Sequence, residues 1–169
     1  MKFRSLYESR TENLGVTIKP AEVKQILNRD PEKFHLQWLT DRRFIISLNF
    51  SYGSNLIFDI NRPNTKSEIL FYGKLTEIEN SKTKIELKTR SKTFLATLLI
   101  VLPLLVVFLQ IIIKFEWPIF LIQFAIFPLA IIGLLNFIRS EEDGLLRNFK
   151  EYLNDEIIKH DKNVAGKLL

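Results

Sequence analysis

The pattern of polar and apolar positions is dominated by a block between residues 93 and 138 that carries almost no charge. Thr93–Ile113 and Pro118–Ile138 are two stretches of 21 residues without a charged side chain. As helices, each would be about 32 Å long at about 1.5 Å per residue, which is enough to cross a hydrocarbon core of about 30 Å. Helix is the required geometry because lipid offers no partners to backbone N–H and C=O groups. We therefore predict two transmembrane helices, since so small a chain has no further layer to cover two buried helices.

The link between the two predicted spans is only four residues long, Lys114–Trp117, so the helices must form an antiparallel hairpin. Basic residues gather on both outer flanks of the hairpin, whereas its tip holds a single lysine. The flanking basic residues are Lys82, Lys84, Lys88, Arg90 and Lys92 before the first span, and Arg139, Arg147 and Lys150 after the second. By the positive-inside rule we expect a multi-pass protein of the cytoplasmic membrane with both termini in the cytoplasm.

Polar residues and prolines interrupt the two spans. Gln110 and Gln123 lie at similar depths on either side of the tip, so a hydrogen bond across the hairpin is expected, with amides that reach water or headgroups as the equal alternative. Pro103 and Pro128 lie near mid-span, where each removes a helix hydrogen bond and is expected to kink its helix. Asn136 is the third amide.

The pattern of residues 1–92 predicts a small cytoplasmic α+β domain with an antiparallel meander and one short helix. Pro20–Asn28 has proline at a helix start and apolar residues at helical spacing. Runs rich in Phe, Ile and Leu, separated by polar turns, predict the strands. The expected strands are Gly15–Lys19, Phe34–Leu39, Arg43–Phe50, Asn55–Ile60, Ile69–Glu77 and Lys82–Arg90.

The last of these strands has the clearest alternation. Charged residues occupy every even position from Lys82 to Lys92, and Ile85 and Leu87 lie among the odd ones. Because side chains alternate between the faces of a strand, Ile85 and Leu87 should point into the core and the charged residues outward. Lys88, Arg90 and Lys92 lie nearest the first span and are candidates for contact with lipid headgroups. A solvated sheet face that also marks topology is the favoured alternative.

The pattern of residues 139–169 predicts a cytoplasmic amphipathic helix and tail. Ser140 followed by Glu141, Glu142 and Asp143 is typical of a helix start. One apolar stripe follows, made of Leu145, Leu146, Phe149, Leu153 and Ile157. The helix could lie on the membrane, bind a partner or dock on the N-terminal domain. Its mixed charge argues against a purely lipid-bound helix. Docking is favoured, because the helix and the N-terminal domain should both be cytoplasmic and adjacent.

The composition offers little for catalysis. The chain of 169 residues has no cysteine, which removes disulfides, thiol catalysis and cysteine-ligated metals. Its two histidines, His35 and His160, are far apart, and no HExxH, GxSxG, P-loop or GxGxxG motif occurs. We therefore expect no enzyme activity, no cofactor and no metal. The net charge of +5 lies mostly beside the apolar block, and no nucleic-acid-binding motif is present, so no nucleic-acid partner is expected.

Two short stretches before the hairpin carry a family resemblance. Phe71–Leu75, followed by Ser81–Leu87 and then the hairpin, resembles a "GKI … gTkI" strand pair in small, mostly uncharacterised bacterial membrane proteins. In that group an α+β domain precedes a two-helix transmembrane hairpin. The resemblance covers residues 15–138 and implies a bacterial cytoplasmic membrane protein. The group has no established activity or site residues, so none is carried over.

Three functions are compatible with this organisation. The first is a membrane-anchored, non-catalytic interaction or regulatory module whose partner is a cytoplasmic or membrane protein. The second is a self-associating subunit of a membrane assembly, such as a channel or a transporter accessory, to which the mid-span prolines and amides point. The third is a membrane-surface enzyme acting on lipid or cell-envelope precursors, for which only the basic juxtamembrane face argues.

Overall fold

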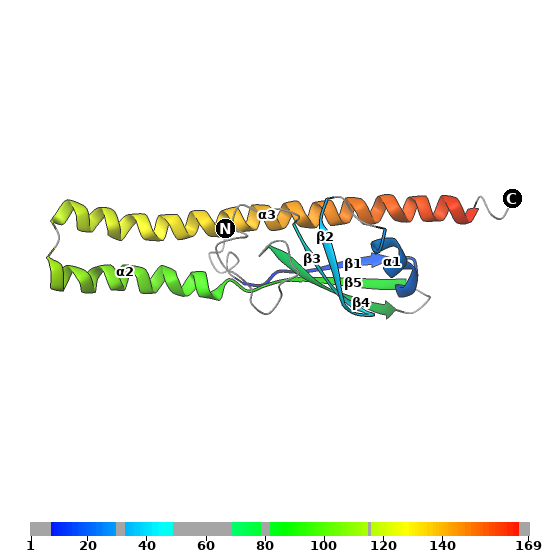
Figure 1. Cartoon of the computed structure of the whole chain (residues 1–169), viewed down its shortest axis with the longest axis horizontal. Helices are drawn as coiled ribbons and strands as arrows, with labels where there is room; N and C mark the ends of the chain where they lie inside the picture. The colour runs from blue at the N-terminus through cyan, green and yellow to red at the C-terminus, as the bar shows by residue number, and fades with distance from the viewer. Residues whose placement is uncertain (1–7, 30–32, 49–68, 79–81, 115, 166–169) are drawn as a thin grey trace. The chain divides into compact units, whose positions relative to one another are not determined.

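The computed structural model describes residues 8–29, 33–48, 69–78, 82–114 and 116–165, except for the side chains of residues 93, 96 and 161–165. The chain forms two compact units (Figure 1). One unit contains residues 10–90 together with 141–169, and the other contains residues 1–9 together with 91–140. The predicted strand Asn55–Ile60 lies outside the described residues.

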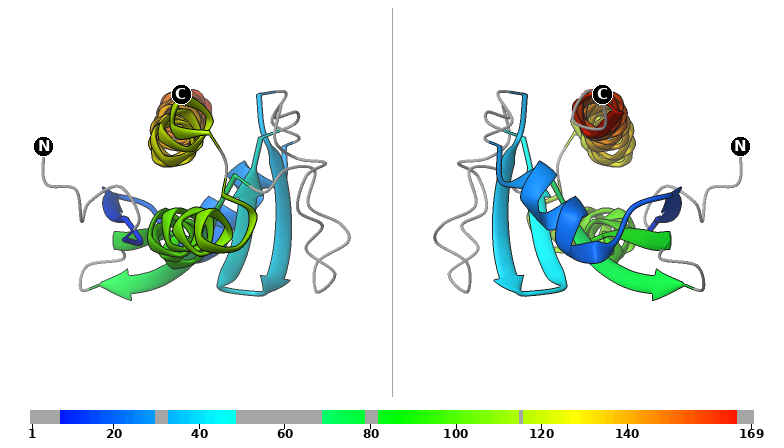
Figure 2. Two further views of the ribbon diagram at one scale, coloured as in Figure 1. Left: turned by 90° about the vertical axis from the view of Figure 1, so that its left-hand side faces the viewer. Right: turned by 90° about the vertical axis from the view of Figure 1, so that its right-hand side faces the viewer.

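The first unit is built on a five-stranded antiparallel sheet in the order β1-β5-β4-β3-β2. Its strands are β1 (Thr11–Val16), β2 (His35–Thr40), β3 (Arg43–Ser47), β4 (Leu70–Ile78) and β5 (Lys82–Thr89). The predicted meander is confirmed for β2 to β5, and β1 adds to the far side of β5. The C-terminal part of α3 lies on the same side of the curved sheet as α1 (Figure 2).

β1 begins earlier than the Gly15–Lys19 strand that the sequence predicts. Its polar start, Thr11-Glu12-Asn13, has no apolar alternation, but it pairs along β5 from Thr11↔Lys88 to Val16↔Thr83. Backbone pairing therefore determines this strand where side-chain pattern does not. At the other end, Ile18 lies beyond the strand, and its carbonyl accepts a hydrogen bond from the buried Thr83 hydroxyl at 2.6 Å.

The short helix α1 (Pro20–Leu27) begins as predicted, with proline in its first turn. The side chain of Glu22 accepts a hydrogen bond from the Lys19 N–H at 3.1 Å, which satisfies a donor that the helix leaves unpaired. Val23, Ile26 and Leu27 are fully buried. The helix therefore covers one face of the sheet with its apolar side.

The core of this unit joins the sheet, α1 and the C-terminal part of α3 in one apolar cluster. Ile85 and Leu87 are fully buried, as the alternation of β5 predicts. Phe149 is also fully buried, and its ring centroid lies 5.6 Å from that of Phe34 and 6.1 Å from that of Phe44. The docking of the C-terminal stripe on the N-terminal domain is thus confirmed.

The second unit contains α2 (Thr93–Ile113) and the first part of α3 (Trp117–Ala165). α2 ends at Lys114, which has the left-handed conformation (φ 55°, ψ 57°) that closes many helices. Ile131 and Leu135 of α3 are buried against leucines of α2, namely Leu95, Leu98, Leu99 and Leu102. The two helices therefore pack through a narrow leucine-rich contact.

α3 differs from the prediction in one respect, because it is a single helix of 49 residues rather than a span followed by a separate helix that starts at Ser140. The expected cap at Ser140 is therefore wrong. No proline or glycine lies between Gly133 and Gly144, so nothing in the sequence ends the first helix before Ser140. An acidic turn can begin a helix, but it does not break one that is already under way.

Candidate functional surface

The three basic residues nearest the first apolar helix do not share one environment. Lys88, near the end of β5, and Arg90 are exposed, whereas Lys92 is only 9% exposed. Contact of these residues with lipid headgroups stays a prediction, and Lys88 and Arg90 present the accessible charges.

The outward face of β5 is charged, as its alternation predicts. Thr83, Ile85, Leu87 and Thr89 are buried on the core face. Lys82 and Lys88 are exposed on the opposite face, with the half-buried Lys84 and Glu86 between them. One side of the strand therefore builds the core and the other presents lysines.

Strand register brings two further cations to this outward face. Arg43 of β3 lies opposite Lys74 of β4, and Lys74 lies opposite Glu86 of β5. Residues directly opposite one another project from the same face of a sheet. Arg43 and Lys74 are both exposed. Sequence reasoning did not select them, because only the pairing of β3 with β4 shows that they adjoin the lysines of β5.

The opposite end of the outward face is apolar and buried. Ile45 and Leu70 are 1% and 2% exposed, and Ser47 is fully buried beside them. Tyr72, opposite Ile45, is half-buried. The exposed cations of the outward face therefore lie outside this apolar region, beside neutral residues such as Thr76.

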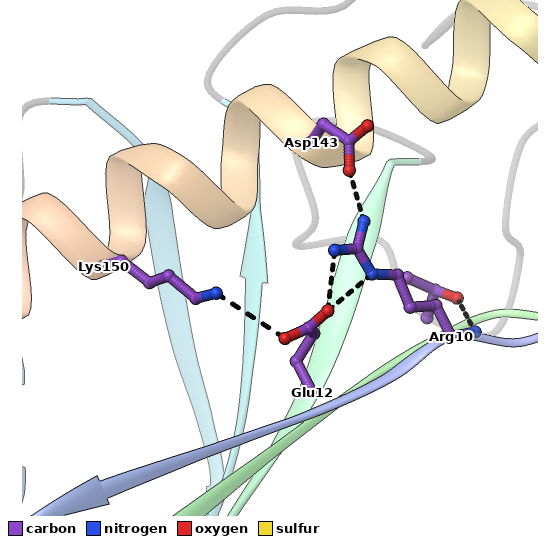
Figure 3. A network of polar contacts seen from close by, with 5 residues as sticks. Arg10, Glu12, Asp143 and Lys150 are labelled. Atoms are coloured by element: carbon purple, nitrogen blue, oxygen red, sulfur yellow. Dashed lines mark hydrogen bonds and ion pairs between the residues drawn. The ribbon is translucent and has the colours of Figure 1, made fainter.

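A polar network connects β1 to α3 (Figure 3). Nε of Arg10 donates to Oε1 of Glu12 at 2.8 Å, and the Arg10 guanidinium also pairs with Asp143. Nζ of Lys150 lies 3.6 Å from Oε2 of Glu12. The hydrogen bond from Arg10, followed by the charges of Arg10 and Lys150, holds the pKa of Glu12 below its ordinary value against the opposing effect of desolvation.

Three further ion pairs lie along the same helix. Arg29 donates to Glu156 at 3.0 Å, and Lys159 pairs with the same carboxylate. These two hydrogen bonds, Lys159 first, lower the pKa of Glu156. Lys33 pairs with Glu151 at 3.3 Å. These carboxylates serve as ion-pair partners that fix α3 on the domain, which is a structural role.

The predicted intramembrane residues lie within the two long helices. Gln110 and Gln123 are both half-buried, and their mutual hydrogen bond stays a prediction. α2 continues through Pro103 and α3 through Pro128, so neither proline ends its helix. Nδ2 of Asn136 donates to the carbonyl of Ile132 at 3.0 Å within α3 itself.

The two histidines occupy separate elements. His35 is half-buried on β2 opposite Ser47, and His160 is half-buried near the end of α3. Within the residues whose placement the structure gives, no three His, Cys, Asp or Glu side chains are grouped so that they could hold a metal ion.

Comparison with known proteins gives no relative from which a role could be carried over. No protein-family model, curated protein or solved structure matches the chain. The structure alone shows an α+β protein in which, among the described residues, one helix, Trp117–His160, is long and apolar enough to cross a membrane.

Proposed function

We propose that the protein is a membrane-anchored, non-catalytic interaction module. In this proposal α2 and residues 117–138 of α3 cross the cytoplasmic membrane as a hairpin. The α+β unit then lies on the cytoplasmic side, where it holds a protein partner at the membrane.

The observation that carries the proposal is the exposure of large apolar side chains on both helices of the hairpin. Ile111 is 70% exposed, Ile100 and Leu129 are 66% exposed, and Leu104 is 64% exposed. Large apolar surfaces of this kind are stable in lipid but not in water. A hydrocarbon environment accounts for them on two helices at once.

Topology can be tested with single cysteines, because the chain has none of its own. Thr76→Cys and Asn154→Cys place thiols on exposed positions of the α+β unit, and Glu116→Cys places one at the hairpin tip. An impermeant maleimide applied to intact cells should label Glu116→Cys alone. Labelling of Thr76→Cys and Asn154→Cys instead would place the α+β unit outside the cytoplasm. Extraction of the protein by alkaline carbonate would disprove the anchor.

The interaction role needs a separate experiment. The full chain should co-purify with the same protein partner from native membranes in mild detergent, and a variant that keeps the hairpin but lacks the α+β unit should not. Repeated purification without any partner contradicts the role, whatever the topology.

A further inference from the structure

We infer that the outward face of the sheet, around the first half of β5, binds an acidic surface of the partner protein. We call this surface the basic patch, and it consists of Arg43, Lys74, Lys82, Lys84 and Glu86. The inference rests on the proposed function and adds to it the location and chemistry of the contact.

The patch is a continuous surface built by strand register. Arg43, Lys74 and Glu86 form one row across three strands, and Thr76 and Lys84 form the next row. Lys82 follows on β5 opposite Ile78. Neighbouring strands lie about 4.8 Å apart, and alternate residues along a strand lie about 6.8 Å apart, so four cations share an area with one acid.

The patch places like charges side by side. Arg43 and Lys74 lie directly opposite one another, and like charges in that position destabilise a sheet. Glu86, opposite Lys74 on its other side, offsets part of this repulsion, and an acidic partner would relieve the rest. Charge complementarity of this kind raises the rate and specificity of association.

The position of Glu86 favours a protein over a polyanion. Glu86 lies within the patch, opposite Lys74 and between Lys84 and Lys88 on its own strand. A uniformly anionic nucleic acid or bilayer would repel this carboxylate. An acidic protein surface can place one lysine or arginine against it, so a mixed but mainly acidic surface fits best.

The test is a photocrosslinker at Thr76, which is exposed beside Lys74 and opposite Lys84. In native membranes it should yield one recurring protein adduct, whose surface is acidic. The triple variant Arg43→Glu, Lys74→Glu, Lys84→Glu should lose the adduct. The control Arg147→Glu, a charge reversal at an exposed position of α3, should keep it.

The captured protein is then purified and its binding to the full chain in phosphatidylcholine nanodiscs is measured. The triple glutamate variant should weaken this binding by at least about tenfold, and added salt should weaken the wild-type complex. A triple glutamine variant, with circular dichroism to confirm the fold, should give an intermediate loss.

Several results would overturn the inference, namely a lipid or nucleic-acid adduct at Thr76, no adduct, or a protein adduct that survives the triple variant. If a partner still co-purifies with that variant, the proposed function stands and only the location of the contact is wrong. If the wild-type chain has no partner at all, both fail.

Discussion

Phe137 and Phe149 lie on the same helix, yet Phe137 is 41% exposed and Phe149 is fully buried. The first part of α3 exposes apolar residues around much of its surface, whereas the second part gathers them in a stripe that the sheet and α1 cover. The comparison shows that one uninterrupted helix can combine a part with exposed apolar side chains and a part whose apolar stripe is buried. The backbone of α3 stays helical throughout. What changes along it is the distribution of polar residues around the helix.

The largest expected effect comes from the buried half of this comparison. Phe149→Ala removes the ring that packs against Phe34 and Phe44 and leaves a cavity in the core, so it should cost about 3–5 kcal/mol of unfolding free energy. Urea unfolding in detergent, followed by the fluorescence of Trp38 in a Trp117→Phe background, measures the loss.

Phe137→Ala is the matched control, since it makes the same chemical change on the same helix. Because Phe137 is exposed, its removal should change the stability of the α+β unit by less than about 0.5 kcal/mol. Equal losses in the two variants would remove the distinction between the two parts of α3.

The next largest effect tests the continuity of α3. Glu141→Pro removes a backbone hydrogen bond inside the helix and should cost about 3 kcal/mol or more. If a new helix began at Ser140 instead, proline would sit in its first turn and be tolerated. Ser140→Ala is the companion variant and should be nearly neutral, whereas loss of a true cap costs about 1 kcal/mol.

A smaller effect is expected at Gly73 of β4. A Cβ atom at this position would lie 2.3 Å from Cζ of Phe44, which is closer than any carbon contact allows. Gly73→Ala should therefore cost about 1–3 kcal/mol through displacement of the ring. Gly15→Ala on β1 is the control, because its added Cβ has no neighbour within 4 Å. A neutral Gly73→Ala would show that the Phe44 ring can move freely.

The smallest effect is pH-dependent and concerns the network between β1 and α3. The pKa of Glu12 is lowered in the folded state, so its contribution to stability is complete above the ordinary value of about 4.3 and is lost as the pH falls through the lowered value. Glu12→Gln should cost less than about 1 kcal/mol at pH 7, since the carboxylate is partly exposed.

That difference should shrink below about pH 4. The measurement is urea unfolding of wild type and Glu12→Gln between pH 3 and pH 7. Glu77→Gln, at an exposed position of β4, should give a curve parallel to that of wild type. A difference that stays constant down to pH 3 would exclude the ion pair as its cause.

Local patterns in the sequence predict the elements better than they predict how the elements join. The alternation of β5 places Ile85 and Leu87 correctly, and the stripe containing Phe149 correctly predicts docking. β1 begins earlier than predicted because backbone pairing with β5, rather than side-chain pattern, determines it. Ser140 is not a cap, because a capping signal begins a helix only where the preceding helix has ended, and α3 continues through this residue.

The candidate surface was predictable only in part. The lysines of β5 follow from alternation within a single strand. Arg43 and Lys74 could not be assigned to the same surface, because their adjacency depends on the register of β3 with β4. Register depends on contacts between residues far apart in the sequence, which no short window contains.

The burial of Phe149 among Phe34, Phe44 and α1 has a consequence for biosynthesis. The sheet, once translated, lacks one wall of its core until residues 145–153 leave the ribosome, and both apolar helices are translated before then. The nascent α+β unit therefore cannot complete its core, and its apolar surface stays exposed, while the two apolar helices are synthesised. Ribosome-bound chains stalled before residue 145 should accordingly be sensitive to protease, and the released chain of 169 residues should be protected.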